Sequence, residues 1–174
     1  MKIAIGCDHR GIEFKSKIIN FLKSKNIEVN DLGTATTASC DYPDFGFKVA
    51  DTVAKKEADW GILVCNSGIG MSIVANKVNG IRAALCINEK LAEYARLHND
   101  ANILVIGSEF VNSELAESII NKWIATQFEG DRHIKRLQKI KDREELQIPK
   151  EECDRIVKKM QDEVRKWQSQ VWRR

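Results

Sequence analysis

The residues with the clearest chemical potential follow the apolar run WGILVC, which ends in a thiol at Cys65. The next residues, NSGIG at positions 66–70, predict the start of a helix. Backbone N–H groups at a helix start attract negative charge, and the same field lowers the pKa of a nearby thiol. Because glycines let the backbone approach a ligand closely, this loop is suited to hold a base beside an oxyanion. The alternative is a buried and inert cysteine at a strand end.

Two other uses of such a loop do not fit this sequence. A phosphotyrosine-type phosphatase needs an arginine after five intervening residues, and Met71 occupies that position here. A dinucleotide-binding fold needs GxGxxG after its first strand, where this sequence reads GCDHRG. The loop therefore favours neither of these two classes.

Histidines are the next candidates for proton transfer. The chain has three: His9 in CDHRG, His98 in LHND and His133 in GDRHIKR. A lone histidine is more often an ordinary surface residue than a catalytic one. Two of the three, however, are expected at or near the edge of the sheet where ligands bind, which favours a role in the site.

The segment GDRHIKR supplies a candidate phosphate site. Asp131 is a possible N-cap, and Arg132 and Arg136 lie four residues apart on one helix face. Two guanidinium groups at a helix start form a good receptor for phosphate, although a solvated basic face would show the same pattern. A thiol base, an oxyanion site, a histidine and a phosphate clamp together indicate enolisation of a sugar phosphate. This chemistry needs no metal, because backbone amides supply the electrophile.

The elements that must position these groups alternate along the chain. Apolar runs predict strands at 2–6, 27–32, 60–65, 81–87 and 102–107. Helical periodicity predicts helices at 12–24, 44–56, 70–78, 89–98 and 112–126. Strict alternation predicts an α/β fold with a parallel sheet covered on both faces, whose ligands bind beyond the carboxyl ends of the strands. The polar loop at 33–44 is expected at the rim of that site.

The composition indicates which kinds of partner and which cellular location to expect. The 174 residues carry a net charge of only +3, which does not favour nucleic acid. No signal pattern is visible at the N-terminus, and no apolar run approaches the roughly 20 residues of a membrane span. Five cysteines without paired spacing predict neither a disulfide framework nor a zinc site. We therefore expect free thiols, a cytoplasmic location and no membrane partner.

The C-terminal segment differs in character. A division into domains at 1–149 and 150–174 is predicted, with the second forming an amphipathic helical extension. Apolar residues step by four and three along this segment, at Cys153, Val157, Met160, Val164, Trp167 and Val171. That is the spacing of a heptad seam about two and a half repeats long. It predicts a helix packed on its own domain or on a sister subunit, with a docking helix for another protein as the alternative.

Several separated motifs resemble the type B ribose-5-phosphate isomerases, whose wider family includes allose-6-phosphate isomerase and the galactose-6-phosphate isomerase subunits. In chain order the motifs are IAIGCDHRG, DYPDF, GILVCNSGIGMSIVANK, GIRAALC, ARLHNDAN and GDRHIKR. The resemblance runs from residue 1 to about residue 146. The resemblance implies a Rossmann-like, three-layer α/β/α sandwich with a five-stranded parallel sheet. It also implies homodimers or homotetramers with active sites shared at the dimer interface. The implied reaction interconverts ribose 5-phosphate and ribulose 5-phosphate through a cis-enediolate, in the pentose phosphate pathway and without a cofactor.

The resemblance also implies roles for individual residues. Cys65 would move a proton between C1 and C2 of the sugar. His98 of a neighbouring subunit would open the furanose ring, and Asp8 would assist at the ring hydroxyls. The oxyanion would be held by Ser67 and by the backbone of Asn66, Gly68, Ile69 and Gly70. The sugar would contact Tyr42 and Asn99, and the phosphate would contact His9, Arg132 and Arg136.

Three departures from the family pattern bear on the substrate. The usual loop begins Cys-Gly-Thr-Gly, whereas Asn66 and Ser67 stand in the middle positions here. Many relatives carry an arginine at the position of Glu109, and a carboxylate there would repel a phosphate unless it points away. The tail beyond about residue 149 is longer than the family core. The alternatives that stay open are an isomerase of a six-carbon sugar phosphate or a free rare sugar, and a non-catalytic sugar-phosphate sensor.

Overall fold

The computed structural model describes residues 1–146 and 150–171, with side chains described for 1–146 and 152–167. The chain forms two compact units, Met1–Leu137 and Gln138–Arg174, and each is considered by itself. The predicted boundary at residue 149 falls outside the described residues. The division into 1–149 and 150–174 therefore stays a prediction.

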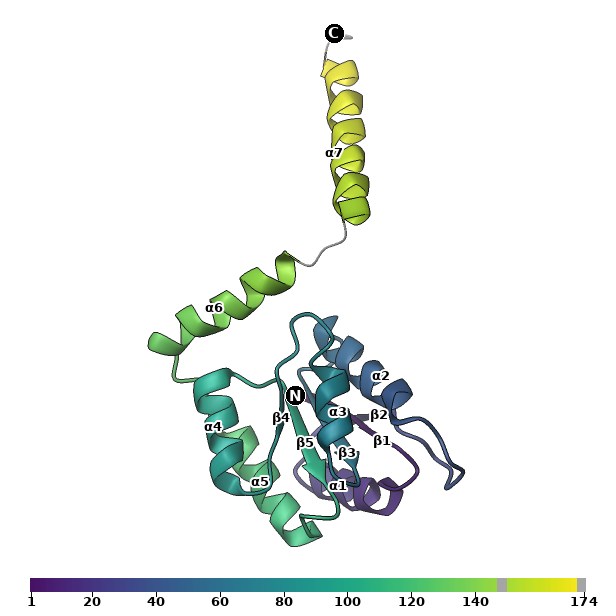
Figure 1. Cartoon of the computed structure of the whole chain (residues 1–174), viewed down its shortest axis with the longest axis vertical. Coiled ribbons are helices and arrows are strands. Elements are labelled where there is room, and N and C mark those ends of the chain that lie inside the picture. The colour runs from purple at the N-terminus through teal and green to yellow at the C-terminus, as the bar shows by residue number, and fades with distance from the viewer. Residues whose placement is uncertain (147–149, 172–174) are drawn as a thin grey trace. The chain divides into compact units, whose positions relative to one another are not determined.

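Strands and helices alternate through the first unit, as the sequence predicts (Figure 1). The strands are β1 (Lys2–Cys7), β2 (Glu28–Asp31), β3 (Trp60–Cys65), β4 (Ala83–Leu85) and β5 (Ile103–Gly107). The helices are α1 (Ile12–Ser24), α2 (Tyr42–Ala54), α3 (Ile69–Ala75), α4 (Glu89–Asn99), α5 (Ser113–Ala125), α6 (Arg132–Glu145) and α7 (Lys150–Val171). The first residues of α6 belong to the first unit, and α7 belongs to the second.

The sheet has five parallel strands in the order β2-β1-β3-β5-β4, which confirms the predicted fold. The chain reaches β2 on one side of β1 and then crosses to β3 on the other side. The strand order therefore reverses between β1 and β3, and in open α/β sheets ligands bind where that reversal occurs. The carboxyl ends of β1 and β3, at Cys7 and Cys65, lie at this position.

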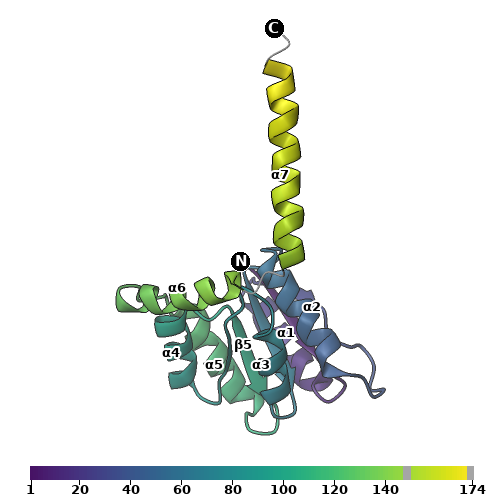
Figure 2. The ribbon, with the colours of Figure 1, turned by 45° about the horizontal axis from the view of Figure 1, so that its top comes forward.

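Alternate residues of the strands build two separate cores, so that the fold has three layers. Figures 1 and 2 show α4 and α5 on one side of β5, with α2 and α3 on the other. Side chains such as Ile5, Val64 and Ile106 pack with α1, α4 and α5. Side chains such as Leu63 and Val105 pack with α2 and α3, in the core that also contains Cys65.

Several elements are shorter than the sequence predicts, among them α3 and β4. The helix expected at 70–78 ends at Ala75, and the strand expected at 81–87 covers only Ala83–Leu85. The side chain of Asn76 explains both limits, because its amide bonds the carbonyls of Ser72 and Ala83 and its oxygen accepts from the N–H of Ala83. One side chain thus ends the helix and ties it to the start of the strand.

A partly buried ion pair fixes the start of the polar loop at 33–41. The ammonium of Lys15, on α1, is 3% exposed and donates to both carboxylate oxygens of Asp31, at 2.7 and 2.8 Å. It also donates to the carbonyl of Thr34 at 3.1 Å. Lys15 thereby holds the end of β2 and the first residues of the loop together.

The second unit contains the predicted C-terminal helix, α7. Its described seam residues Val157, Met160, Val164 and Trp167 are between 51% and 64% exposed within this unit. The side chain of Val171, the last member of the predicted seam, lies outside the described residues. Among the helices of the described residues, none is both long enough and apolar enough to span a membrane.

Candidate active site

The carboxyl ends of β1 and β3 bring a thiol and a carboxylate together. The register pairs Cys7 with Val64, so the residues that follow them, Asp8 and Cys65, are neighbours. The thiol of Cys65 donates to Oδ2 of Asp8 over 3.6 Å, and both side chains are buried. Oδ1 of Asp8 accepts a bond from the backbone N–H of Arg10 at 3.0 Å, which fixes the carboxylate.

The environment of Cys65 opposes ionisation of its thiol. Burial and the negative charge of Asp8 raise the pKa of Cys65 above its ordinary value of 9.0, although the backbone amides of Gly68 and Asn66 lower it. The expectation of a lowered thiol pKa is therefore wrong. The helix start does act on the sulfur in the predicted direction, but desolvation and the neighbouring carboxylate outweigh it.

At its glycines, the loop after β3 has a backbone conformation and close contacts that other residues would not allow, as the sequence predicts. Gly68 adopts a φ of +78°, a conformation that favours glycine. A Cβ at Gly70 would lie 2.8 Å from two ring carbons of Tyr42, so the tyrosine ring packs directly on the glycine. Tyr42 and the loop thus form one continuous surface.

Part of the expected oxyanion site is bonded internally. The hydroxyl of Ser67 accepts a hydrogen bond from the backbone N–H of Ile69 at 3.3 Å, and the side chain of Ile69 is exposed. A sugar oxygen would have to replace that bond to use both groups. The amides of Asn66 and Gly68, which face the sulfur of Cys65, are the donors nearest to the base.

His9 lies beside Asp8 at the same edge of the sheet, and the polar loop orients its ring. The backbone N–H of Cys40 donates to Nδ1 of His9 at 3.3 Å, and the Cys40 sulfur lies 3.6 Å from the same atom. Because Nδ1 accepts this bond, the proton of a neutral His9 is on Nε2. His9 therefore presents a donor on Nε2.

Glu109 lies next to the Cys65 loop, to which its backbone is bonded. Its backbone N–H donates to the carbonyl of Asn66 at 3.0 Å, and that of Ser108 donates to the carbonyl of Cys65 at 3.0 Å. The turn after β5 is thus bonded to the turn after β3. The side chain of Glu109 is exposed.

A second group of predicted site residues lies at the opposite edge of the sheet. The helix α4 runs back from the carboxyl end of β4, so His98 and Asn99, at its end, lie near the start of β5. His133, which stacks on His98, is there too. The expectation that two of the three histidines lie at the ligand-binding edge is therefore wrong, because only His9 does.

The two arginines belong to this second group. Arg132 begins α6 and Arg136 follows one turn later, and both are exposed, as predicted for a phosphate receptor. Asp131 has a φ of +43°, which differs from the extended backbone of a typical N-cap. In one chain, therefore, His9 and the arginine pair do not share a site.

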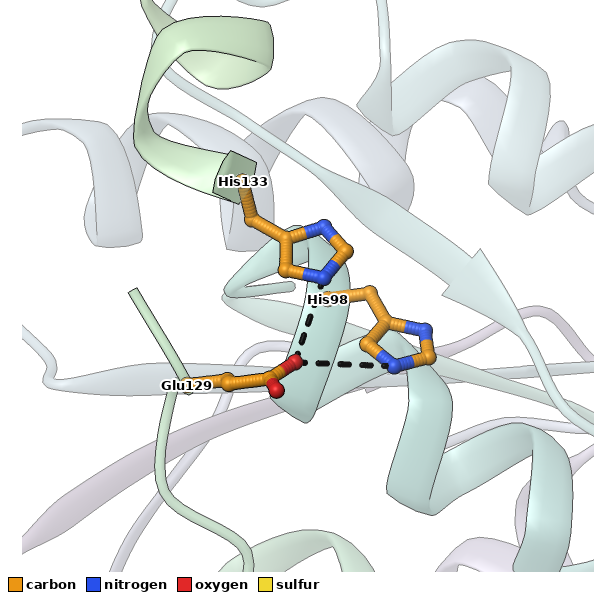
Figure 3. A group of neighbouring side chains, drawn as sticks. All are labelled: His98, Glu129 and His133. Carbon is orange, nitrogen blue, oxygen red and sulfur yellow. Dashed lines mark ion pairs between the residues drawn. The ribbon is translucent and has the colours of Figure 1, made fainter. Parts of the chain in front are cut away.

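Glu129, which no sequence motif identified, interacts with both histidines of this group (Figure 3). Its Oε2 lies 3.2 Å from Nε2 of His133 and 3.9 Å from Nε2 of His98. The spacing of four residues between Glu129 and His133 was the available signal. In the described residues these three side chains form the one group of metal-ligand type, with ligand atoms within 4.8 Å of one another.

The ring geometry at these histidines does not favour metal binding. The rings of His98 and His133 are stacked, with centroids 4.6 Å apart and planes inclined by 16°. An imidazole nitrogen binds a metal with a lone pair that lies in the ring plane. Lone pairs in two nearly parallel planes do not converge on one ion, so this arrangement would have to rotate before it could hold a metal.

Known proteins resemble this chain over its first four fifths. A model of the ribose/galactose isomerase family matches residues 3–140. A putative sugar phosphate isomerase of Rickettsia conorii is 50% identical over 139 residues, covering 80% of this chain and 96% of the relative. Ribose-5-phosphate isomerase B of Escherichia coli is 45% identical over 139 residues, covering 80% of this chain and 93% of the relative.

Solved structures agree with these sequence matches. Ribose-5-phosphate isomerase B of Clostridium thermocellum superposes with a TM-score of 0.82 at 50% identity, covering 83% of this chain and 98% of the other. The enzyme of Mycoplasma genitalium with bound ribulose 5-phosphate superposes with a TM-score of 0.80 at 43% identity, covering 83% and 96%. Both groups of candidate residues lie within the family match. The chain therefore belongs to the ribose/galactose isomerase family.

Proposed function

We propose that this chain is an aldose–ketose isomerase that interconverts ribose 5-phosphate and ribulose 5-phosphate. The observation that carries the proposal is the buried contact between Cys65 and Asp8 at the sheet reversal, flanked by the backbone amides of Asn66 and Gly68. Relatives named ribose-5-phosphate isomerase B support the choice of a five-carbon substrate. The solved relative that holds ribulose 5-phosphate supports it further.

The reaction needs a base that faces a carbon next to a carbonyl. The thiolate of Cys65 removes the proton from C2 of the open-chain aldose, and the carbonyl oxygen on C1 becomes the oxyanion of an enediolate. The proton of the C2 hydroxyl moves to the oxygen on C1, and returning the abstracted proton to C1 then gives the ketose with its carbonyl at C2. Amides of the loop stabilise the oxyanion, because they are held in place before the charge develops. The raised pKa of Cys65 means that forming the thiolate is part of the barrier.

We also propose that each active site is shared between two copies of the chain. Cys65 pairs with Gly107 at the end of β5, whereas His98 precedes the start of that strand. The five residues of β5 span about 13 Å along the sheet, at the usual rise per residue. A single chain therefore cannot bring Cys65, His98 and the arginine pair to one sugar. A homodimer in which His98, Asn99, Arg132 and Arg136 of one copy face Cys65 of the other would complete the site.

The direct test is exchange of the C2 proton of ribose 5-phosphate with solvent deuterium. The wild-type chain should exchange the proton and release ribulose 5-phosphate. Cys65→Ala should lower the rate by at least about a thousandfold, the scale of losing a catalytic acid–base group, while circular dichroism stays unchanged. A sensor that only binds the sugar would exchange no proton. A hexose-phosphate isomerase would turn over allose or galactose 6-phosphate faster than the pentose.

The location of the enzyme is a further part of this proposal. All five cysteines are free. Two of them, Cys7 and Cys86, are buried and have pKa values raised by burial to about 11 and about 12, so they are poor partners for oxidation. Free thiols of this kind support a cytoplasmic location, where the redox environment is reducing.

A further inference from the structure

The ring of His98 stacks on two neighbouring rings. It stacks on Tyr94 of the same helix, with centroids 4.8 Å apart and planes inclined by 20°. It also stacks on His133 of α6, at 4.6 Å and 16° (Figure 3). These contacts fix the plane of the imidazole. They do not determine which of its two nitrogens carries the proton.

The carboxylate of Glu129 can determine which nitrogen of His98 carries the proton. Its backbone N–H donates to the carbonyl of Leu97 at 2.9 Å, which ties Glu129 to the last turn of α4. Its Oε2 lies on the Nε2 side of His98, at 3.9 Å (Figure 3). That distance is too long for a hydrogen bond, and catalytic contacts of this kind often shorten when substrate binds. A carboxylate on the Nε2 side stabilises a proton on Nε2 and leaves Nδ1 as the basic nitrogen.

His133 keeps this carboxylate in place from the other side. The side chain of His133 is 4% exposed, and its Nε2 lies 3.2 Å from the same oxygen of Glu129. The oxygen lies off the axis of a hydrogen bond, so the buried Nε2 has no hydrogen-bond partner among the described residues. An unsatisfied buried polar group costs about 1–3 kcal/mol, and the carboxylate of Glu129 is the charge beside this one. The same carboxylate oxygen of Glu129 therefore lies near Nε2 of both His98 and His133.

We propose that Glu129 is a positioning residue that holds His98 in the tautomer needed to open the furanose ring. This inference rests on the proposed function. Ring opening breaks the bond between C1 and the ring oxygen O4 and forms the C1 carbonyl. Nδ1 of His98 takes the proton from the C1 hydroxyl and delivers it to O4, so no proton is gained or lost overall. Glu129 stabilises the imidazolium formed between these two transfers.

Glu129→Gln tests the proposal, because it keeps the size of the side chain and removes its charge. With ribose 5-phosphate, kcat/KM should fall about ten- to a hundredfold, the range for losing a group that orients a catalytic ligand. With 4-deoxyribose 5-phosphate, which cannot close a furanose ring, it should fall less than about threefold, since ring opening is not needed. Glu129→Asp should recover part of the loss. Glu117→Gln, an exposed change on α5, is the matched control and should behave as wild type.

A second measurement reads the tautomer directly. Nitrogen NMR of the substrate-free protein with labelled histidine should show a proton on Nε2 of neutral His98 in the wild type, and a mixture of tautomers in Glu129→Gln. Equal losses on both sugars, or an unchanged tautomer in the variant, would overturn the proposal. If the wild-type chain isomerised neither sugar, the proposed function would fail, while the tautomer would still decide the role of Glu129.

Discussion

The thiol of Cys65 and the carboxylate of Asp8 are in contact across the point where the strand order of the sheet reverses, with Sγ 3.6 Å from Oδ2. Burial and this carboxylate raise the pKa of the thiol, so the proposed base of the reaction is mostly protonated at neutral pH. The charge of Asp8 thus controls how much thiolate is available.

Removing the charge of Asp8 should lower the pKa of Cys65. In Asp8→Asn, the rate of Cys65 alkylation by iodoacetamide at pH 8 should rise roughly tenfold, the effect of one pKa unit. Peptide mapping separates Cys65 from the other thiols. In the wild type, alkylation should keep rising as pH passes 9, because the pKa is raised above its ordinary value of 9.0. A slower reaction in Asp8→Asn would mean that the carboxylate assists thiolate formation.

Gly70→Ala should disturb the sugar site through Tyr42. The added Cβ would lie 2.8 Å from the tyrosine ring, which is partly exposed and can move aside. We expect KM for ribose 5-phosphate to rise about tenfold, with a small change in melting temperature. Tyr42→Ala is the matched background, and Gly70→Ala should have little further effect there. An equal effect in both backgrounds would show that the glycine acts independently of Tyr42.

Replacing the exposed Glu109 should change phosphate binding. Its backbone is bonded to the Cys65 loop, so its charge acts close to the substrate. Glu109→Arg should lower KM for ribose 5-phosphate about tenfold, the scale of one charge contact. Glu57→Arg, an exposed charge reversal that precedes the start of β3, is the control. An unchanged KM in Glu109→Arg would place the side chain away from the phosphate.

The ion pair under the polar loop should contribute to stability. Lys15→Met should lower the free energy of unfolding in urea by about 2 kcal/mol, less than the 3–5 kcal/mol for a fully buried pair. The smaller value reflects Asp31, whose side chain is 43% exposed and can be hydrated when alone. Lys17→Met, an exposed change on the same helix, should cost little. Equal stability of the two variants would show that the pair contributes nothing.

The sequence predicts the parts of this protein that depend on local pattern. Alternation of apolar runs and helical periodicity is enough to place the five strands, and a glycine-rich loop after a strand is enough to identify Cys65. The pKa of Cys65 could not be predicted, because it depends on Asp8, which is 57 residues away in the chain. The spacing of four residues relates Glu129 to His133, but its approach to His98 could not be predicted, since only tertiary packing brings Glu129 and His98 together.

The edge occupied by His98 was predictable in principle from connectivity. A helix between two parallel strands returns to the amino ends, so a residue at its end lies far from the carboxyl ends. Whether a second chain supplies that histidine depends on a surface contact, which no local pattern encodes.

Complementation between two inactive variants tests the shared site most directly. Cys65→Ala and His98→Asn should each be nearly inactive when purified alone. When the two are coexpressed and form mixed dimers, one of the two sites contains both substitutions and the other contains neither. Random pairing should then restore about a quarter of wild-type activity toward ribose 5-phosphate. Activity that stays at the level of the separate variants would contradict a site built from Cys65 of one copy and His98 of the other.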